Sequence, residues 1–176
     1  MQAASIHFQT DRLTASAFTF QDLDELRHLH QDEQVMRTLG GIRSAEQTEH
    51  FLAEKIKHWQ THGFGYWIFR HQATADFVGR AGLQHIHIGG RDEVEVGYTV
   101  ARRHWGQGYA TEMAQAMIDI AFQQLALPTL VCFTLTTNLP SQRVMRKVGF
   151  TFERKITHAN QPHVLYRLNR ESVIGD

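Results

Sequence analysis

The clearest chemical pattern in this sequence lies at residues 102–111, Arg-Arg-His-Trp-Gly-Gln-Gly-Tyr-Ala-Thr, between a predicted strand and a predicted helix. Gly106 and Gly108 stand one residue apart just before that helix. Glycines let the backbone approach a ligand closely, and the unpaired N–H groups and dipole of a helix N-terminus favour an anion. The pattern predicts a phosphate or pyrophosphate site, although a tight turn would use the same two glycines.

Two common nucleotide-binding motifs do not fit this junction. A P-loop has four residues between its glycines, followed by Lys and then Ser or Thr. A Rossmann fingerprint has Gly or Ala at the position of Thr111 and an acidic residue after the next strand, where this chain has Thr136, Thr137 and Asn138. A nucleotide-binding α/β protein therefore remains only a remote alternative.

The predicted strand 93–101, just before the junction, alternates between two faces. One face carries Val94, Val96, Tyr98 and Val100, and the other carries Glu93, Glu95, Gly97 and Thr99. Both carboxylates point away from the apolar layer, so either could act as a general base in proton transfer. An ordinary solvated carboxylate is the alternative for each.

The periodicity of the rest of the chain predicts an α/β (α+β) order with a single sheet. Strands are expected at residues 65–72, 77–88, 93–101, 130–135, 151–157 and 163–168. Apolar residues at helical spacing predict helices near 20–29, from a capping box at Ser44 to Trp59, and over 110–125 before Pro128. A short helix is expected at 140–147, with a proline in its first turn and Gly149 just past its end.

Size and composition limit the possible classes of protein. A chain of 176 residues and 20.3 kDa favours one domain over residues 1–176. Its 18 basic and 18 acidic residues give zero net charge, so the surface of a strongly basic nucleic-acid module is not expected. The single cysteine indicates a reducing compartment, and neither a signal segment nor a membrane-spanning run is visible. We expect a cytoplasmic protein with no nucleic-acid or membrane partner.

Several spaced motifs together resemble the GNAT superfamily of N-acetyltransferases. Arg103-x-x-Gly106-x-Gly108 is similar to that family's acetyl-CoA pyrophosphate loop, which lies between its fourth strand and third helix. Segments 95–98, 138–141 and 147–150 stand where the family requires them, and segments 10–13, 65–68 and 78–83 resemble the branch with the ribosomal-protein N-terminal acetyltransferases. The resemblance covers residues 8–169. One departure is Ala15-Ser16, where that branch usually has Leu-Arg.

The resemblance implies a GNAT-like fold: a mixed, mostly antiparallel sheet of about seven strands flanked by about four helices. It implies acetyl-CoA as cofactor, with its pyrophosphate on the N–H groups of the junction and its pantetheine paired, like an added strand, with the backbone of the strand before it. The implied cofactor-binding residues are Val96, Tyr98, Val100, Arg103, His104, Trp105, Gly106, Gln107, Gly108, Tyr109, Ala110, Asn138 and Ser141.

The same resemblance suggests catalytic roles. Glu95 is the first candidate for the base, acting through water, and Glu93 is the second. Many members protonate the leaving thiolate with a tyrosine on the fourth helix, but no tyrosine occurs between Leu139 and Gly149. A serine can stand in within the branch that this chain resembles, which points to Ser141. Helix capping by Asn138 and Ser141 is the alternative.

The predicted function is transfer of an acetyl group from acetyl-CoA to a primary amine, either a protein N-terminus or a small molecule, by direct attack in a ternary complex. A non-catalytic acetyl-CoA-binding or sensing domain is the alternative. Residues 20–60 and the hairpin near 158–163 would shape the acceptor site, and the acidic residues of segment 22–33 would suit a cationic amine unless they form a solvated helix face.

Other reactive side chains have simpler explanations. Cys132 lies in an apolar strand without an adjacent base, which favours a packing thiol over an acyl carrier. His85 and His87 share a strand face, but no third ligand is suggested by spacing, so no metal site is expected. We expect a monomer or a homodimer.

Overall fold

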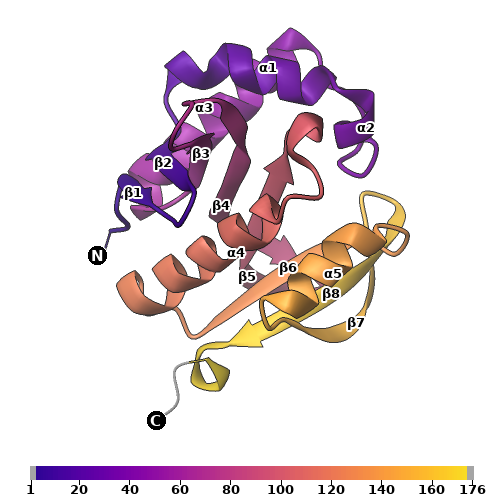
Figure 1. Cartoon of the computed structure of the whole chain (residues 1–176). Coiled ribbons are helices and arrows are strands. Elements are labelled where there is room, and N and C mark those ends of the chain that lie inside the picture. Colours follow the sequence, from indigo (N-terminus) through magenta and orange to yellow (C-terminus); the bar gives the residue numbers. More distant parts are fainter. Residues whose placement is uncertain (1–2, 174–176) are drawn as a thin grey trace.

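The computed structural model describes residues 3–173, and within them eight strands form one sheet in the order β1-β2-β3-β4-β5-β6-β8-β7 (Figure 1). The strands are β1 (His7–Gln9), β2 (Leu13–Ala17), β3 (Tyr66–His71), β4 (Phe77–Ile88), β5 (Arg91–Val100), β6 (Thr129–Leu135), β7 (Thr151–His158) and β8 (Gln161–Asn169). All neighbours are antiparallel except β5 and β6, which run parallel. The predicted single, mostly antiparallel sheet is thus confirmed.

Five α-helices occur in the described residues: α1 (Leu23–Gln31), α2 (Glu33–Met36), α3 (Ala45–His62), α4 (Tyr109–Asp119) and α5 (Leu139–Lys147). Figure 1 shows α4 and α5 in front of the sheet, while α1 and α3 lie together at the β2–β3 end. The main core packs α4 and α5 on one sheet face through residues such as Met113 and Met145. A second core packs α1, α2 and α3 on Tyr66 and Ile68.

Local sequence explains where most helices begin and end. Ser44 and Gln47 form the predicted capping box of α3, and Gly63 ends that helix in the left-handed conformation, with φ of 72°. Pro140 lies in the first turn of α5, as expected, and Gly149 follows its end with φ of 98°. Helix α4 continues into a π-helical turn, Ile120–Gln124, before Pro128.

The counts of elements differ slightly from the prediction. Two strands, β1 and β2, lie outside the ranges that the periodicity predicted; β1 has three residues and β2 five, too few to show a clear alternation. The additional helix, α2, has four residues and exists because Asp32 caps it by accepting from the N–H groups of Gln34 and Val35. Phe20 was expected on the apolar face of the first helix, but it lies in a 3-10 turn and is 61% exposed.

None of the helices in residues 3–173 is long and apolar enough to cross a membrane. The predicted domain of residues 1–176 includes residues 1, 2 and 174–176, which lie outside the described part of the chain.

Candidate functional site

The site is built around an opening between β5 and β6. These parallel strands pair at one position, Glu95 with Val131, while β5 stays paired with β4 along its whole length. From Val96 to Val100, one edge of β5 therefore has no strand beside it. A free strand edge can pair with an extended ligand through its N–H and C=O groups. The carbonyl of Val100 already accepts the indole N–H of Trp105 at 2.8 Å, so that carbonyl is partly occupied.

The glycine-rich loop lies at the end of β5 and leads into α4. Gly106 and Gly108 have φ of 73° and 82°, a left-handed conformation that side chains rarely adopt. Gly108 is the N-cap of α4, and no side chain caps that helix. The first-turn N–H groups of a helix have no acceptor within the helix, so they are available to an anion. The loop thus fits a pyrophosphate, as the sequence predicts.

The side chains of the loop take different directions. Arg103 donates to the carbonyl of Phe77 at 3.0 Å, so its guanidinium is committed to the neighbouring strand. Trp105 is 48% exposed, whereas Tyr109 is buried in the main core. His104 packs edge-on against the Tyr109 ring at 5.8 Å. The predicted contacts of this segment with the cofactor therefore stay a prediction, and they concern its backbone N–H groups rather than its side chains.

Arg12 and Glu112 support the loop from a distant part of the sequence. The Arg12 guanidinium donates to the carbonyl of Gln107 at 2.8 Å and to Glu112 at 2.7 Å, and it lies 4.3 Å from the Tyr109 ring centre. Burial acts to raise the pKa of Glu112, but hydrogen bonds from Thr10 and Arg12 outweigh it and hold that pKa below the usual range. The motif at 10–13 includes Thr10 and Arg12, but the sequence did not show that they support the loop.

Glu95 lies where β5 and β6 begin to separate. One carboxylate oxygen of Glu95 accepts a hydrogen bond from the side-chain N–H of Gln84 at 2.5 Å. The side-chain carbonyl of Gln84 in turn accepts a hydrogen bond from the ammonium of Lys55. Burial raises the pKa of Glu95, although the Gln84 hydrogen bond and the charges of Lys55 and Arg80 oppose the shift. A carboxyl with a raised pKa is better matched to accept a proton near neutral pH.

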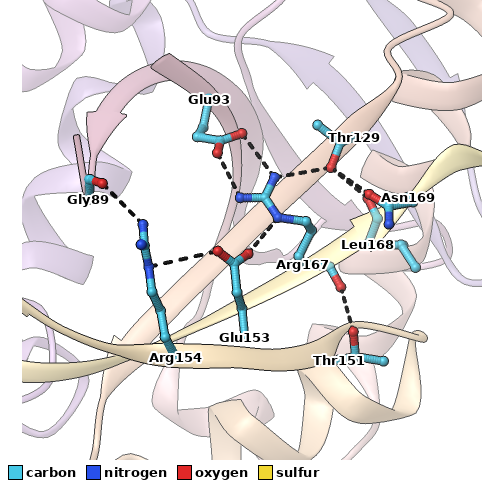
Figure 2. A network of polar contacts seen from close by, with 9 residues as sticks. All are labelled: Gly89, Glu93, Thr129, Thr151, Glu153, Arg154, Arg167, Leu168 and Asn169. Atoms are coloured by element: carbon cyan, nitrogen blue, oxygen red, sulfur yellow. Dashed lines mark hydrogen bonds and ion pairs between the residues drawn. The ribbon is translucent and has the colours of Figure 1, made fainter. Parts of the chain in front are cut away.

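Glu93, the second candidate base, is held in an ion pair (Figure 2). Its two oxygens accept both terminal nitrogens of Arg167, at 3.1 and 2.7 Å, and its side chain is 7% exposed. Arg167 also binds Glu153 at 2.5 Å. Because Arg167 binds both of its oxygens, Glu93 connects β5 to β8. Glu95 is therefore the carboxylate that is better placed to accept a proton.

The side chain of Ser141 lies next to that of Tyr98. The sequence predicted a cofactor contact for the backbone of Tyr98 but no role for its side chain. The hydroxyl of Tyr98 lies 3.0 Å from Ser141 Oγ and 3.1 Å from the Ser141 carbonyl. Burial, with a smaller effect of Cys132, raises the pKa of Tyr98 well above its usual value, so the phenol keeps its proton. Because Tyr98 shares a strand face with Val96, its side chain could have been expected on the α5 side.

Asn138 and Cys132 have the structural roles that the sequence reading offered. Asn138 caps α5 by accepting the N–H of Ser141 at 3.3 Å, and its amide donates to Thr134 at 2.9 Å. Cys132 is buried in the main core, and this burial raises its pKa, which keeps the sulfur protonated and unreactive.

Arginines pair with four of the five carboxylates in the acidic segment 22–33. Asp22 and Glu25 both pair with Arg70, and Arg27 pairs with Asp24 at 3.2 Å. The carboxylate of Asp32 forms an ion pair with Arg102 at 3.5 Å, and it also caps α2. Glu33 is in none of the ion pairs found in residues 3–173, and Asp22 and Glu25 share one arginine, so the segment keeps a net negative charge. The suggested attraction for a cationic amine stays a prediction.

Comparisons with known proteins agree with this geometry. Residues 12–151 match the family model described as Acetyltransferase (GNAT) domain. The "Uncharacterized protein YkkB" of Bacillus subtilis is 30% identical over 138 residues, covering 78% of this chain and 80% of the relative. The solved acetyltransferase from Agrobacterium tumefaciens matches with a TM-score of 0.82 and 25% identity, covering 96% of this chain and 97% of the other.

A further solved structure is RimL, described as a ribosomal L7/L12 alpha-N-protein acetyltransferase in complex with Coenzyme A. It matches with a TM-score of 0.76 and 17% identity, covering 91% of this chain and 95% of the other. At that identity the likeness concerns the fold.

Proposed function

Because this chain belongs to the GNAT family of acetyl-CoA-dependent acetyltransferases, we propose that it transfers the acetyl group to a primary amine by direct attack in a ternary complex. One observation carries the proposal. Glu95, a half-buried carboxylate whose pKa desolvation raises, lies where the β5–β6 opening begins, and the hydroxyls of Tyr98 and Ser141 meet beside the same strand. A proton acceptor and a proton donor thus flank one opening.

Acetyl-CoA would supply the acetyl thioester at this opening. The N–H groups around Gly106 and Gly108 would bind its pyrophosphate, and the free edge of β5 at Val96 and Tyr98 would pair with its amide groups. The carbonyl of Val100 is already shared with Trp105, so we expect less from that position.

The chain's own residues would move two protons. The amine nitrogen forms a C–N bond to the acetyl carbon, the C–S bond breaks, and the sulfur leaves with the bonding electrons. Glu95 takes the proton that the amine loses, through a water, and the hydroxyls of Tyr98 and Ser141 supply a proton to the sulfur. Exchange with solvent then restores both groups.

The acceptor is proposed to be a small-molecule amine or a peptide N-terminus. The test measures release of free thiol from acetyl-CoA by the full chain across peptides, polyamines, aminoglycosides and amino acids. Turnover with any of these amines supports acetyl transfer. Calorimetric binding of acetyl-CoA without turnover would favour the sensing domain instead, and binding of ATP or NAD in place of CoA would contradict the proposal.

Three further expectations stay predictions from the sequence. They are one acetyltransferase domain over residues 1–176, a cytoplasmic location based on the single cysteine, and a monomeric or homodimeric state.

A further inference from the structure

Three cationic side chains surround the ring of Phe51 on α3. The guanidinium carbons of Arg43 and Arg80 each lie 4.8 Å from the ring centre, and the ammonium of Lys55 lies 5.2 Å from it. Arg80 and Lys55 also lie near the ring of Tyr66, at 5.4 and 5.5 Å. We refer to Arg43, Lys55 and Arg80 as the cation cluster.

Among the described residues no carboxylate lies within ion-pair distance of the cation cluster, although the charge of Glu95 favours the charged forms of Lys55 and Arg80 from farther away. None of the ion pairs found there includes Arg43, Lys55 or Arg80. Arg80 is 5% exposed, and its Nε has no hydrogen-bond partner; Nη1 of Arg43 is also buried without one. Arginine cannot lose its proton in a protein, so such buried charge is costly unless a partner joins it.

A nearby histidine is affected by the same positive charge. The pKa of His30, whose ring lies 5.1 Å from that of Phe51, is lowered to about 3 by burial and then by the charges of Arg80 and Arg43. The region around the ring of Phe51 is thus electropositive. His30 is neutral there and supplies no negative charge.

The cation cluster shares a sheet face with the proposed base. Arg80 on β4 pairs with Thr99, and Gln84 on β4 pairs with Glu95, so all four side chains point to one side. Four residues of strand separate Arg80 from Gln84, which corresponds to about 13 Å. Between them lie Gly82 and Gly97, where side chains would collide with the ring of Tyr66.

The cation cluster also borders a surface hollow. A hollow of about 540 Å³ is lined by residues that include Gly41, Arg43, Phe51 and Glu54. Arg43 thus belongs to both the hollow and the cation cluster, and Phe51, the ring that the three cations surround, also lines the hollow.

We propose that the cation cluster binds an anionic group of the acceptor, a carboxylate or a phosphate, while the acceptor's amine reaches toward Glu95. The inference rests on the proposed acetyl transfer and narrows the acceptor to amines that carry an anion. It is an alternative to the cationic amine suggested by segment 22–33, four of whose five carboxylates pair with arginines. Nε of Arg80 and Nη1 of Arg43, which are buried without a hydrogen-bond partner, are the donors that such an anion would satisfy.

The test compares amines that differ only in the anion. Carboxylates are examined with triglycine and trialanine against their C-terminal amides, and phosphate with the peptide amide Ala-Ala-phosphoserine against Ala-Ala-serine, because an extended tripeptide separates the amine from the anion by several ångströms; spermidine serves as a further amine. We expect at least one anionic amine to show a kcat/KM about tenfold or more above that of its neutral twin. The arm that shows the preference identifies the type of anion.

Variants connect the preference to the cation cluster. Arg80→Gln and the more accessible Arg43→Gln should each lower the ratio of anionic to neutral kcat/KM about tenfold, whereas Arg37→Gln, an exposed arginine on the same segment as Arg43, should leave it unchanged. Arg43→Gln keeps the test decisive if Arg80→Gln does not fold. A wild-type preference for neutral or cationic amines, or a ratio unchanged by Arg43→Gln, would overturn the anion site alone. No turnover with any amine would overturn acetyl transfer itself, and this inference with it.

Discussion

Glu93 and Glu95 are the same residue type on the same strand face, yet their surroundings separate them. Arg167 on β8 binds both oxygens of Glu93, whereas Glu95 has one hydrogen bond to Gln84 and lies at the start of the β5–β6 opening. The arginine therefore occupies the oxygens that Glu93 would need to accept a proton from an amine. Desolvation raises the pKa of Glu95.

Replacement of this base should remove one ionisation from the pH profile. With an accepted amine, we expect Glu95→Gln to lower kcat/KM about 100-fold, since general bases contribute on that scale. The wild-type acid limb should lie above the ordinary range of glutamate, because the raised pKa keeps Glu95 protonated and inactive to higher pH. Initial rates against pH for both proteins, with exposed Glu33→Gln as control, measure this. An unchanged acid limb in Glu95→Gln would show that Glu95 is not the base.

Tyr98 and Ser141 form a pair of hydroxyls whose effects should overlap. Ser141→Ala should reduce kcat only slightly, because Tyr98 remains and a thiolate can leave unassisted. The double variant Tyr98→Phe and Ser141→Ala should lower kcat about tenfold while the Kd for acetyl-CoA stays close to that of the wild type. Steady-state kinetics and calorimetry separate the two quantities. A weakened Kd with kcat intact would indicate packing rather than proton transfer.

At the scale of elements, the loop before α4 shows how a short pattern and a distant support combine. The two glycines provide left-handed backbone that precedes an uncapped helix. Arg12 and Glu112 then hold the loop against the β1–β2 turn, through contacts between residues about one hundred positions apart. The pattern was visible in the sequence, but the support depends on the fold.

Gly108→Val tests the loop as an anion site. Gly108 has φ of 82°, and an added Cβ would lie 3.4 Å from Arg12 Nη2, so valine should distort the loop and fill the space above its N–H groups. We expect affinity for acetyl-CoA to fall at least about 100-fold in a calorimetric titration, since several charge-assisted hydrogen bonds are lost.

Gly90→Val is the matched control for backbone strain. Gly90 has φ of 81°, lies in the β4–β5 turn, and has no atom within 4 Å of an added Cβ. This variant should bind acetyl-CoA as the wild type does. Equal affinities in Gly108→Val and Gly90→Val would count against the loop assignment.

At the scale of the whole molecule, the sheet must open between β5 and β6 without coming apart. β6 pairs with β8 over seven residues, and Arg167 on β8 reaches back to Glu93 on β5. These contacts hold the two halves together at the end away from the loop, while α5 reaches β5 through Ser141 and Tyr98. The opening between β5 and β6 therefore depends on contacts between elements that are far apart in the sequence.

Stability of the molecule should decrease in mild acid because of its buried histidines. His30 is fully buried, with Nδ1 bound to Thr48, and burial lowers its pKa to about 3; that of His58 is lowered to about 4 for the same main reason. The unfolded chain takes up these protons below pH about 6.5, so stability is lost as pH falls. We expect His30 alone to cost about 2 kcal/mol between pH 7 and pH 5.

Urea unfolding at several pH values measures this loss. His30→Leu should decrease the pH dependence of the free energy of unfolding by about the amount assigned to His30, and His58 should account for part of the remainder. His50→Gln, whose side chain is 76% exposed, serves as control and should keep the wild-type slope. The same slope in His30→Leu would contradict the assignment.

The sequence by itself determined the order of elements, the central strands, the capping box at Ser44 and the glycine-rich loop. These features depend on residues within a few positions of one another, because periodicity, caps and left-handed glycines are local properties. The motif order across residues 8–169 added the family, which the comparison of residues 12–151 confirms.

Only the tertiary structure decided which groups meet. It paired Glu93 with Arg167, left Glu95 at the opening and brought Tyr98 to Ser141. It also paired four carboxylates of the acidic segment with Arg70, Arg27 and Arg102. It also gathered cations from α3, β4 and the loop before α3 around one aromatic ring. Most of these partners lie tens of residues apart, and their charge and pKa depend on burial and neighbours that no local pattern contains.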